Sequence, residues 1–397
     1  MKSGVLYISY DGMLEPLGQS QVIAYLERLA ANRTIHLISF EKPEDWRDEH
    51  ARSAIRDRLR DAGIQWHPRR YHRHPTILAT TWDIVVGIAS ALWLISRYGL
   101  RTVHARSYVP SVVAMVAKRL LGTNFIFDMR GFWVDERVDG GLWARDSWIY
   151  QSAKWCERRF LLRADHIVSL TKAAVEEINR FDYVRGRMLA TTVIPTCADL
   201  QRFQPAGWRQ DGFTLGYVGS AGTWYLFDEL VECFIELMRQ RPDARLLIIN
   251  RNEHDFIRRR LELGGVPAGA FELRAASHVE IPIQMARMHA AAFFIKPAFS
   301  KKASAPTKLG ELLGCGLPCL TNQGVGDLAD ILEEGNVGVA VENFERATLA
   351  EGIRRLLEMA ADPRTSKRCR AVANRHFSLD EGVARYESVY RQMDGVR

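Results

Sequence analysis

The sequence has few cysteines, and they do not form a metal-binding or disulfide pattern. None belongs to a Cys-x-x-Cys pair or lies beside a histidine cluster; they are Cys156, Cys197, Cys233, Cys315, Cys319 and Cys369. Structural zinc sites and disulfide frameworks need such spacings, so we expect neither of them. Reduced thiols are typical of cytoplasmic proteins, and we expect that location.

Long hydrophobic runs are also missing. The apolar run at Met1–Tyr10 is too short for a signal peptide and predicts a first buried strand. The longest run, Ile84–Ser96, has 13 residues, whereas a bilayer span needs about 20. It contains Trp93, lies close to Trp82 and follows a basic stretch that includes Arg69. Two interpretations stay open: docking on an anionic membrane, or a buried helix flanked by solvated charges.

A dinucleotide-binding fingerprint is absent. The second half opens with the segment from Gly216 to Gly222, in which the glycines are spaced GxxGxxG rather than GxGxxG. The next predicted strand ends at Asn250, where that fingerprint has an acidic residue. These departures disfavour an NAD-dependent oxidoreductase.

The composition indicates a globular protein with an uneven charge. The 397 residues are 47% hydrophobic and 25% charged, which excludes a disordered chain and favours two domains. The net charge is +7: residues 1–200 hold 28 Lys and Arg against 22 Asp and Glu, an excess of +6, and the remainder holds +1. A basic first half suggests an anionic partner, although arginine-rich genome composition explains it equally well.

Short apolar strands alternate with helical segments in both halves, which predicts parallel sheets covered by helices. The predicted strands are Val5–Ser9, Thr34–Phe40, Thr102–Ala105, Phe125–Asp128, His166–Leu170, Thr192–Ile194, Thr214–Val218, Arg245–Asn250, Ala292–Lys296, Cys319–Asn322 and Val337–Val341. We therefore expect an α/β protein with two Rossmann-like domains, 1–195 and 213–377, joined by a linker at 196–212. A final helix, Asp380–Met393, lies within the last segment, 378–397, where Ser378 and Glu381 form a capping box. Two such domains predict a ligand cleft between them.

Two segments have the pattern of anion-binding sites. After the first strand, a loop leads into a helix that we expect to begin near Gly18, whose backbone amides could hold a phosphate. In Pro297–Pro318, Lys301 and Lys302 precede a helix opened by Pro306 and Thr307 and capped by Thr307 or Ser304. That helix carries Lys308 and Glu311. Lysines near a helix N-terminus suit a diphosphate, and a carboxylate one turn on suits ribose hydroxyls. A turn glycine without a ligand and an ordinary surface helix are the alternatives.

The segment Glu311–Pro318 resembles the second half of the E-x7-E element and G-x-P turn of family-four retaining glycosyltransferases with the GT-B fold. Ile194–Pro205 is similar to the family's interdomain linker, and His104–Ser107 and Ser169–Thr171 resemble further strand-end motifs. The order of elements is similar over nearly the whole chain. The resemblance implies a final helix that crosses back to the N-terminal domain, and a nucleotide-diphosphate sugar as donor.

The sequence departs from the family's pattern at three places. The first Glu of the E-x7-E element is replaced by Ala303, and Ser220–Tyr225 lacks the usual diphosphate-binding Arg and Lys. Asp128–Gly131 stands where the family has a catalytic-domain histidine. Ala305–Lys308 is similar to a phosphate-binding loop of some branches, so we expect the lysines there to take over part of the phosphate charge.

The resemblance implies a retaining hexosyltransferase that needs no metal or other cofactor. We assign the catalytic site to Asp128, Arg130 and Lys308; the donor site to Gly18, Gly219, Ser220, Lys301, Thr307, Lys308 and Glu311; and the acceptor side to Tyr10, His104 and Arg106. The expected partners are a nucleotide sugar and a glycan or polyprenyl-diphosphate-linked acceptor, with possible peripheral contact to an anionic membrane. The expected role is assembly of cell-surface polysaccharide or glycolipid on the inner face of that membrane.

Three other functions stay open. A nucleotide-sugar epimerase of the same fold would need carboxylates and a histidine near the anomeric carbon, which His104 and Asp128 do not decide. A non-catalytic nucleotide-sugar-binding protein is favoured by Ala303 and the missing Arg and Lys. Nucleic-acid binding is disfavoured, because the basic residues are dispersed and no aromatic-basic motif occurs.

Overall fold

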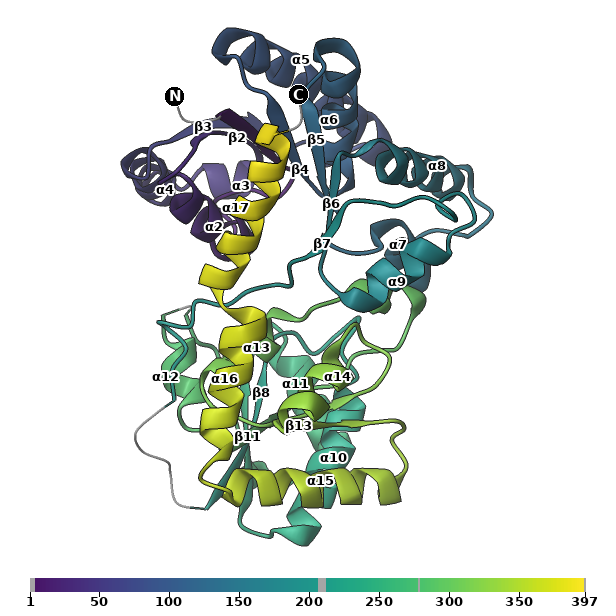
Figure 1. Cartoon of the computed structure of the whole chain (residues 1–397). Coiled ribbons are helices and arrows are strands. Elements are labelled where there is room, and N and C mark those ends of the chain that lie inside the picture. Colours follow the sequence, from purple (N-terminus) through teal and green to yellow (C-terminus); the bar gives the residue numbers. More distant parts are fainter. Residues whose placement is uncertain (1–3, 206–211, 278, 396–397) are drawn as a thin grey trace. The chain divides into compact units, whose positions relative to one another are not determined.

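The computed structural model describes residues 4–205, 212–277 and 279–395 (Figure 1). Contacts within the chain divide it into two compact units. The first unit runs to Pro195 and includes the chain from Gly382, and the second unit is Thr196–Glu381. The predicted linker begins inside the second unit, because Ala198, Leu200 and Phe203 are buried in its hydrophobic core. Residues 206–211 of that linker lie outside the described residues.

The first unit is built on a parallel sheet with the strand order β3-β2-β1-β4-β5-β6-β7. Its strands are β1 (Gly4–Ser9), β2 (Thr34–Glu41), β3 (Ile64–Arg70), β4 (Thr102–Arg106), β5 (Asn124–Asp128), β6 (His166–Ser169) and β7 (Thr191–Val193). The central strands are buried on both faces, which explains why they read as continuous apolar runs. The strand order reverses direction between β1 and β4, the place where open α/β sheets bind ligands.

Helices connect the strands of the first unit. They are α1 (Pro16–Gly18), the π-helical turn η1 (Gln19–Ile23), α2 (Ala24–Leu29), α3 (Pro43–Trp46), α4 (Glu49–Asp61), α5 (Thr76–Tyr98), α6 (Tyr108–Leu121), α7 (Trp133–Asp139), α8 (Trp148–Arg163) and α9 (Lys172–Arg180). The last helix of the chain, α17 (Leu379–Gly395), packs on this unit. Arg33 joins Glu387 at 3.0 Å and Asp394 at 2.8 Å on α17, so the predicted return of the C-terminal helix is confirmed.

The second unit repeats the plan with the strand order β10-β9-β8-β11-β12-β13, again parallel. Its strands are β8 (Phe213–Val218), β9 (Ala244–Ile249), β10 (Phe271–Arg274), β11 (Ala290–Ala292), β12 (Cys319–Asn322) and β13 (Gly338–Val341). Its helices are α10 (Phe227–Gln240), α11 (His254–Leu263), η2 (Ala268–Ala270), α12 (Ile281–Met285), η3 (Phe299–Ala303), α13 (Thr307–Gly314), α14 (Leu328–Gly335), α15 (Arg346–Ala361) and α16 (Thr365–Phe377).

The structure differs from the predicted strands at two sheet edges and at the central strand β11. The strands β3 and β10, which lie at sheet edges, were not among the predicted strands. The residues of β3 are mostly half-exposed and include Pro68, a residue that an edge strand tolerates. The strand predicted at Ala292–Lys296 is misplaced, because β11 is Ala290–Ala292 and shares only Ala292 with it. Ile295 instead forms an isolated antiparallel bridge with Tyr225.

Two predicted helices have different bounds. The apolar run Ile84–Ser96 is the middle of α5, which has 23 residues and is long and apolar enough to cross a membrane. The prediction of a short segment was wrong because Thr76–Asp83 continues the same helix. The helix near Gly18 is broken into α1, η1 and α2. A Cβ at Gly18 would lie 2.0 Å from the Gly12 carbonyl oxygen, so close packing against that loop requires glycine there.

Candidate active site

In the second unit, the loop after β8 lies against the side chain of Lys308. Gly219 has a φ of +114°, and a Cβ there would lie 2.8 Å from the Lys308 Nζ. Glycine is therefore needed both for the backbone conformation and for the approach of the lysine. Residues that are 89 positions apart in the sequence are brought together where β8 ends and α13 begins.

The Lys308 ammonium is buried among aromatic rings. Its Nζ lies 3.8 Å from the ring centroid of Tyr225 and 5.0 Å from that of Tyr217. It has no hydrogen-bond partner among the described residues. Burial lowers the pKa of Lys308 to about 7, although the Glu311 and Glu253 carboxylates favour the charged form. A buried donor without an acceptor is costly, and an anionic ligand would supply the missing acceptor.

Glu311 follows one turn later on α13. Burial raises its pKa to about 7, against the opposite effect of the Lys308 and Arg202 cations. Its carboxylate has no hydrogen-bond partner within the described part of the chain. The helix begins at Thr307 after Pro306 and has no side-chain cap, so the predicted cap by Thr307 or Ser304 is wrong. The first amides of α13 are consequently not covered by a capping side chain.

Glu253, which the sequence analysis did not single out, organises the glycine loop. Its carboxylate accepts hydrogen bonds from Ala221 N at 2.9 Å and Gly222 N at 3.0 Å, and from Asn250 Nδ2 at 2.8 Å. Asn250 also donates to the Gly219 carbonyl at 3.0 Å. An acidic residue does follow the second strand of this unit, but it lies three residues beyond the expected position. It binds the loop amides of its own chain.

The remaining donor-side residues surround the same loop. Ser220 is exposed, and its carbonyl accepts a hydrogen bond from the Tyr217 hydroxyl. Lys301 is buried in η3 with its Nζ 3.7 Å from the Trp224 ring centroid. Ala303, at the position of the family's first Glu, is buried in the same turn. Lys301 and Lys308 thus each lie over an aromatic ring of the segment that follows Gly219.

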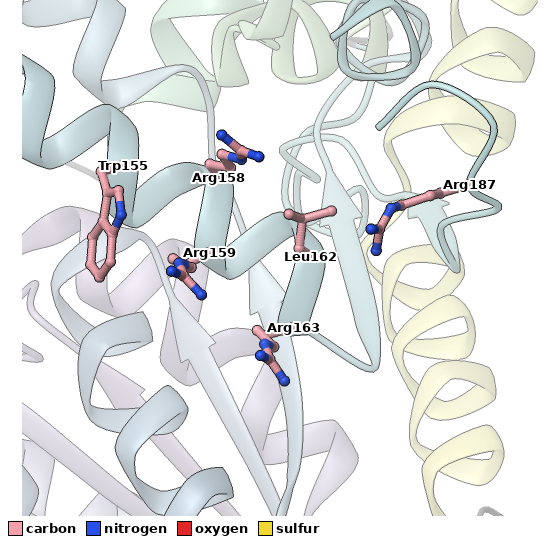
Figure 2. Close-up of a pocket in the computed structure, with 6 residues that line it drawn as sticks. All are labelled: Trp155, Arg158, Arg159, Leu162, Arg163 and Arg187. Atoms are coloured by element: carbon pink, nitrogen blue, oxygen red, sulfur yellow. The ribbon is translucent and has the colours of Figure 1, made fainter. Parts of the chain in front are cut away.

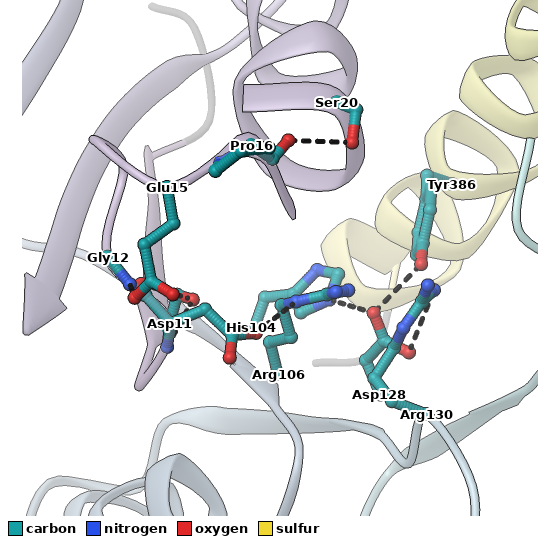
Figure 3. Close-up of polar contacts among 11 residues, drawn as sticks. Asp11, Gly12, Glu15, Pro16, Ser20, His104, Arg106, Asp128, Arg130 and Tyr386 are labelled. Atoms are coloured by element: carbon teal, nitrogen blue, oxygen red, sulfur yellow. Dashed lines mark hydrogen bonds and ion pairs between the residues drawn. The ribbon is translucent and has the colours of Figure 1, made fainter. Parts of the chain in front are cut away.

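In the first unit, a polar group lies where neighbouring strands end. The register pairs Ser9 of β1 with Arg106 of β4, and Arg106 with Asp128 of β5. Parallel strands end at the same edge, so these side chains converge at the carboxyl edge of the sheet. Figure 3 shows His104, Arg106, Asp128 and Arg130 with Tyr386 of α17 close by.

Asp128 is the centre of this polar group. Its Oδ2 accepts a hydrogen bond from the Tyr386 hydroxyl at 2.8 Å and lies 3.4 Å from His104 Nε2. Arg130 Nη1 lies 3.9 Å from Oδ1, and Arg130 itself has a φ of +58°. Burial works to raise the pKa of Asp128, but the Arg130 guanidinium and the bond to His104 outweigh it and hold the pKa at about 2. Asp128 is therefore a carboxylate at neutral pH.

His104 is enclosed rather than open to a ligand. Its side chain is 1% exposed, and Nδ1 lies 2.7 Å from the Tyr390 hydroxyl. Burial lowers the pKa of His104 despite the neighbouring Asp128. The geometry allows His104 to orient Asp128, whereas direct contact with an acceptor would need an exposed ring.

Arg106 and Asp11 form the more open part of the group. Arg106 Nε lies 3.3 Å from Asp11 Oδ2, whereas its buried Nη1 has no hydrogen-bond partner among the described residues. Asp11 was not predicted, and its carboxylate is 43% exposed. Figure 3 also shows Gly12 and Glu15 in this loop, where Gly12 N donates to Glu15 Oε1 at 3.3 Å.

The structure places Tyr10 outside these interactions. Its hydroxyl donates to Asp83 Oδ2 of α5 at 2.9 Å. The amides of Met13 and Leu14 in the same loop donate to Glu41 at 2.9 and 3.3 Å. Glutamates of the chain therefore bind several amides of the loop that was expected to hold a phosphate through Gly18.

No group of three or more His, Cys, Asp or Glu side chains that could hold a metal ion occurs within residues 4–205, 212–277 and 279–395. The basic side chains at the carboxyl ends of the strands are Lys308 and Lys301 in the second unit, and Arg106 and Arg130 in the first. Such cations can stabilise a diphosphate or a developing negative charge.

Solved structures with this architecture define the fold. Sucrose-phosphate synthase from Thermosynechococcus elongatus is 13% identical with a TM-score of 0.74, and all of both chains is covered. Anabaena HepE in complex with UDP is 14% identical with a TM-score of 0.69, covering 99% of this chain and 100% of that one. A putative UDP-N-acetylglucosamine 2-epimerase from Listeria monocytogenes is 12% identical with a TM-score of 0.60, covering 98% and 96%. The chain therefore has the GT-B fold.

The family of the chain follows from two matching family models. Residues 19–196 match the glycosyl transferase 4-like domain, and residues 200–375 match the glycosyl transferases group 1 domain. No curated protein matches the chain. The two domains account for most of its length, so the protein belongs to the group 1 glycosyltransferases of the GT-B fold, as the sequence motifs predicted. Nucleotide-sugar transfer is the activity of this class.

Proposed function

We propose that the protein is a retaining glycosyltransferase that moves a hexose from a nucleotide-diphosphate sugar to a glycan or polyprenyl-diphosphate-linked acceptor. The observation that carries the proposal is the buried Lys308 ammonium, which has no hydrogen-bond partner in the described chain and lies against Gly219. A diphosphate oxygen is a suitable acceptor for it. Glu311, one turn further along α13, suits the ribose hydroxyls of the same nucleotide.

The chemistry exchanges one bond at the anomeric carbon for another. The bond from that carbon to the diphosphate oxygen breaks, and the acceptor oxygen bonds to the carbon on the same face. The acceptor proton passes to the leaving diphosphate oxygen, and the anomeric configuration is retained. Lys308 and Lys301 stabilise the leaving charge, and Gly219, Ser220 and Thr307 line the phosphate-binding loop and helix start.

The first unit takes the acceptor in this proposal. Asp128 and Arg130 lie close to the transferred sugar, and Arg106 has a buried donor available for an anionic group. An acceptor linked to a polyprenyl diphosphate suits these cations and the basic first half. The reaction then takes place on the cytoplasmic face of a membrane, during assembly of a cell-surface polysaccharide or glycolipid.

Fixed cations take the role of a divalent metal in this proposal. Transfer should continue in EDTA at the rate seen in added Mg²⁺. A rate that falls in EDTA and returns with Mg²⁺ would contradict metal independence.

The direct test replaces Lys308 and measures nucleotide binding. HepE is in complex with UDP and UDP-glucose in solved structures, so UDP is the first probe. Lys308→Met should weaken UDP binding in calorimetry by about 1.5–3 kcal/mol, the contribution of a charged hydrogen bond. Lys367→Met, at an exposed lysine of α16, is the control and should bind UDP like the wild type. Equal binding by the wild type and Lys308→Met would contradict the phosphate role.

A second measurement separates transfer from epimerisation. The epimerase alternative needs a histidine and a carboxylate at the anomeric carbon, a role that the buried His104 and Asp128 do not decide, and it would change a nucleotide sugar without any acceptor. Proton NMR of the products should show an unchanged donor configuration without acceptor, and an α-linked product from an α-linked donor when acceptor is present. Inversion at C2 of the donor sugar would identify an epimerase.

A further inference from the structure

The outward face of α5 is apolar instead of charged. Leu78, Trp82, Val85 and Trp93 recur at helical spacing, and they are 69%, 57%, 51% and 58% exposed. Asp83 is the only charged residue between Arg73 and Arg97, and it is buried. A helix on the surface of a water-soluble domain normally presents polar residues on this side, so the stripe indicates a surface that is covered in the working protein.

The opposite side of α5 is fixed to the first unit. Asp83 accepts hydrogen bonds from the Tyr10 hydroxyl at 2.9 Å and the His72 amide at 3.0 Å. Gly87 allows a close approach to α6, because a Cβ there would lie 3.1 Å from Val113. Although α5 has the length and composition of a membrane span, leaving the unit would break these contacts and expose Asp83. The structure therefore favours contact along one face of α5 over insertion.

A pocket lined by arginines lies on α8 of the same unit (Figure 2). Its volume is about 410 Å³, and it is lined by Trp155, Arg158, Arg159, Leu162, Arg163 and Arg187. Within the described residues, none of the four guanidinium groups has an ion-pair partner. Arg159 lies over the ring of Trp155 at 4.9 Å, and Trp155 is itself 55% exposed. Four guanidinium groups without counter-ions attract phosphate groups.

The stripe and the pocket belong to one layer of helices. Helix α6 packs against both α5 and α8. The connections β3 to β4, β4 to β5 and β5 to β6 all advance across the sheet in the same direction, and right-handed crossovers place their helices on the same side. Leu120 and Leu121 are also exposed at the end of α6, the helix that contacts both α5 and α8. We call this surface the outer helical face: the exposed residues of α5, the end of α6 and the arginine pocket of α8.

We propose that the outer helical face binds the surface of an anionic membrane, with lipid phosphates in the arginine pocket and the α5 stripe in the interface. It deepens the proposed function, on which it rests, by naming the surface that meets a lipid-linked acceptor. Tryptophan and arginine together are typical of side chains at a membrane–water boundary. A second copy of the chain is disfavoured as the partner, because it would bring a second set of arginines without ion-pair partners to the same surface. Nucleic acid is disfavoured because it would leave the exposed leucines of α5 and α6 without an apolar partner.

The test measures binding of the full-length protein to sedimented vesicles in the absence of donor. Vesicles of phosphatidylcholine alone are compared with vesicles that also contain phosphatidylglycerol. Wild type should bind only the second kind, and raising the salt from ~0.1 M to ~1 M should release it, because the Debye length falls from about 10 to about 3 Å. Arg159→Gln with Arg163→Gln should lower the partition coefficient about 25-fold, from about 1 kcal/mol for each arginine.

Matched variants separate this effect from loss of charge or folding. Arg258→Gln with Arg259→Gln removes two exposed arginines from α11 of the second unit and should bind vesicles like the wild type. Trp82→Ser with Trp93→Ser should also weaken vesicle binding. All these variants should keep the wild-type melting temperature and UDP affinity, since they change exposed residues distant in sequence from Lys308.

Other outcomes would overturn the proposal. It fails if wild type ignores anionic vesicles at low salt, or if the α8 and α11 double variants bind equally. Pyrophosphate or RNA binding lost in the α8 variant, without vesicle binding, would assign the pocket to a soluble polyanion. If the wild type is a dimer and the double variant Trp82→Ser with Trp93→Ser is a monomer, the stripe is assigned to contact with a second copy. If alkaline carbonate does not release the protein from vesicles, α5 is inserted into the bilayer.

Transfer to a soluble acceptor without vesicle binding would refute only this inference, whereas vesicle binding without transfer would refute the proposed function.

Discussion

At the scale of single residues, Lys308 shows how a folded chain can hold a charge ready for a ligand. The side chain is buried against Tyr217 and Tyr225, and its ammonium has no hydrogen-bond acceptor within the described residues. Burial alone therefore disfavours the charged form, and a bound diphosphate would restore it. Donor binding should consequently be coupled to proton uptake at this lysine.

This coupling predicts how UDP affinity depends on pH. Lys308 has a pKa of about 7 in the empty protein, and a bound diphosphate raises it, so the complex holds more protons above pH 7. Affinity should fall as the pH rises from about 7 to about 9. Because Glu311 also has a pKa of about 7, calorimetry in buffers with different ionisation enthalpies should show more proton uptake by the wild type than by Lys308→Met. Equal proton uptake by the two proteins would show that another group titrates.

Glu311 gives a second prediction at this scale. If its carboxylate accepts hydrogen bonds from both ribose hydroxyls, Glu311→Ala should weaken UDP binding by about 1–3 kcal/mol. The wild type should also bind 2′-deoxy-UDP more weakly than UDP, and the variant should lose that discrimination. A variant that still discriminates the two nucleotides would place the ribose elsewhere.

At the scale of elements, the two units have the same hydrogen-bonding arrangement, although no shared sequence motif produces it. In each unit a glutamate at the end of the second strand or just beyond it binds amides of the loop after the first strand: Glu41, the last residue of β2, binds Met13 and Leu14, and Glu253, which follows β9, binds Ala221 and Gly222. Both loops are thus fixed by hydrogen bonds before any ligand arrives. Such preorganisation reduces the conformational entropy that binding would otherwise lose.

The C-terminal helix α17 also acts as an element of the polar group in the first unit. Tyr386 donates to Asp128, and Tyr390 lies 2.7 Å from the ring nitrogen of His104. Tyr386→Phe should lower the free energy of unfolding by about 1.5–3 kcal/mol, because the buried Asp128 carboxylate loses a charged hydrogen bond. Urea denaturation measures this, and Tyr98→Phe, at a 43% exposed ring of α5, is the control. Equal loss in both variants would show that the hydroxyl bond to Asp128 contributes nothing.

At the scale of the whole molecule, the chain consists of two units, each with buried hydrophobic residues of its own. We expect calorimetry to resolve two unfolding transitions, because each unit buries its sheet independently. UDP should raise only the melting temperature of the second unit, because it binds and stabilises the native state of that unit. Deleting residues 382–397 should lower only the melting temperature of the first unit, since Tyr386, Val389 and Tyr390 are buried in that unit. A single transition shifted by both changes would contradict independent units.

Much of the fold could be predicted from the sequence because its signals are local. Ten of the predicted strands, such as Val5–Ser9 and Phe125–Asp128, coincide closely with observed strands, mostly because buried parallel strands are continuous apolar runs. The edge strands β3 and β10 were missed because their half-exposed residues do not form a continuous apolar run. The full length of α5 was missed where Thr76–Asp83 mixes polar and apolar residues.

The sequence by itself determined the GT-B fold, the family, and Lys308 and Glu311 as residues of interest, because motif spacing and strand periodicity are properties of neighbouring residues. Only the tertiary structure brought Lys308 against Gly219, joined Tyr386 to Asp128, turned Tyr10 toward Asp83 and gathered four arginines around one pocket. The residues in these contacts are far apart in the chain. Which distant residues come into contact depends on how the helices pack on the sheets, and no local sequence pattern records that packing.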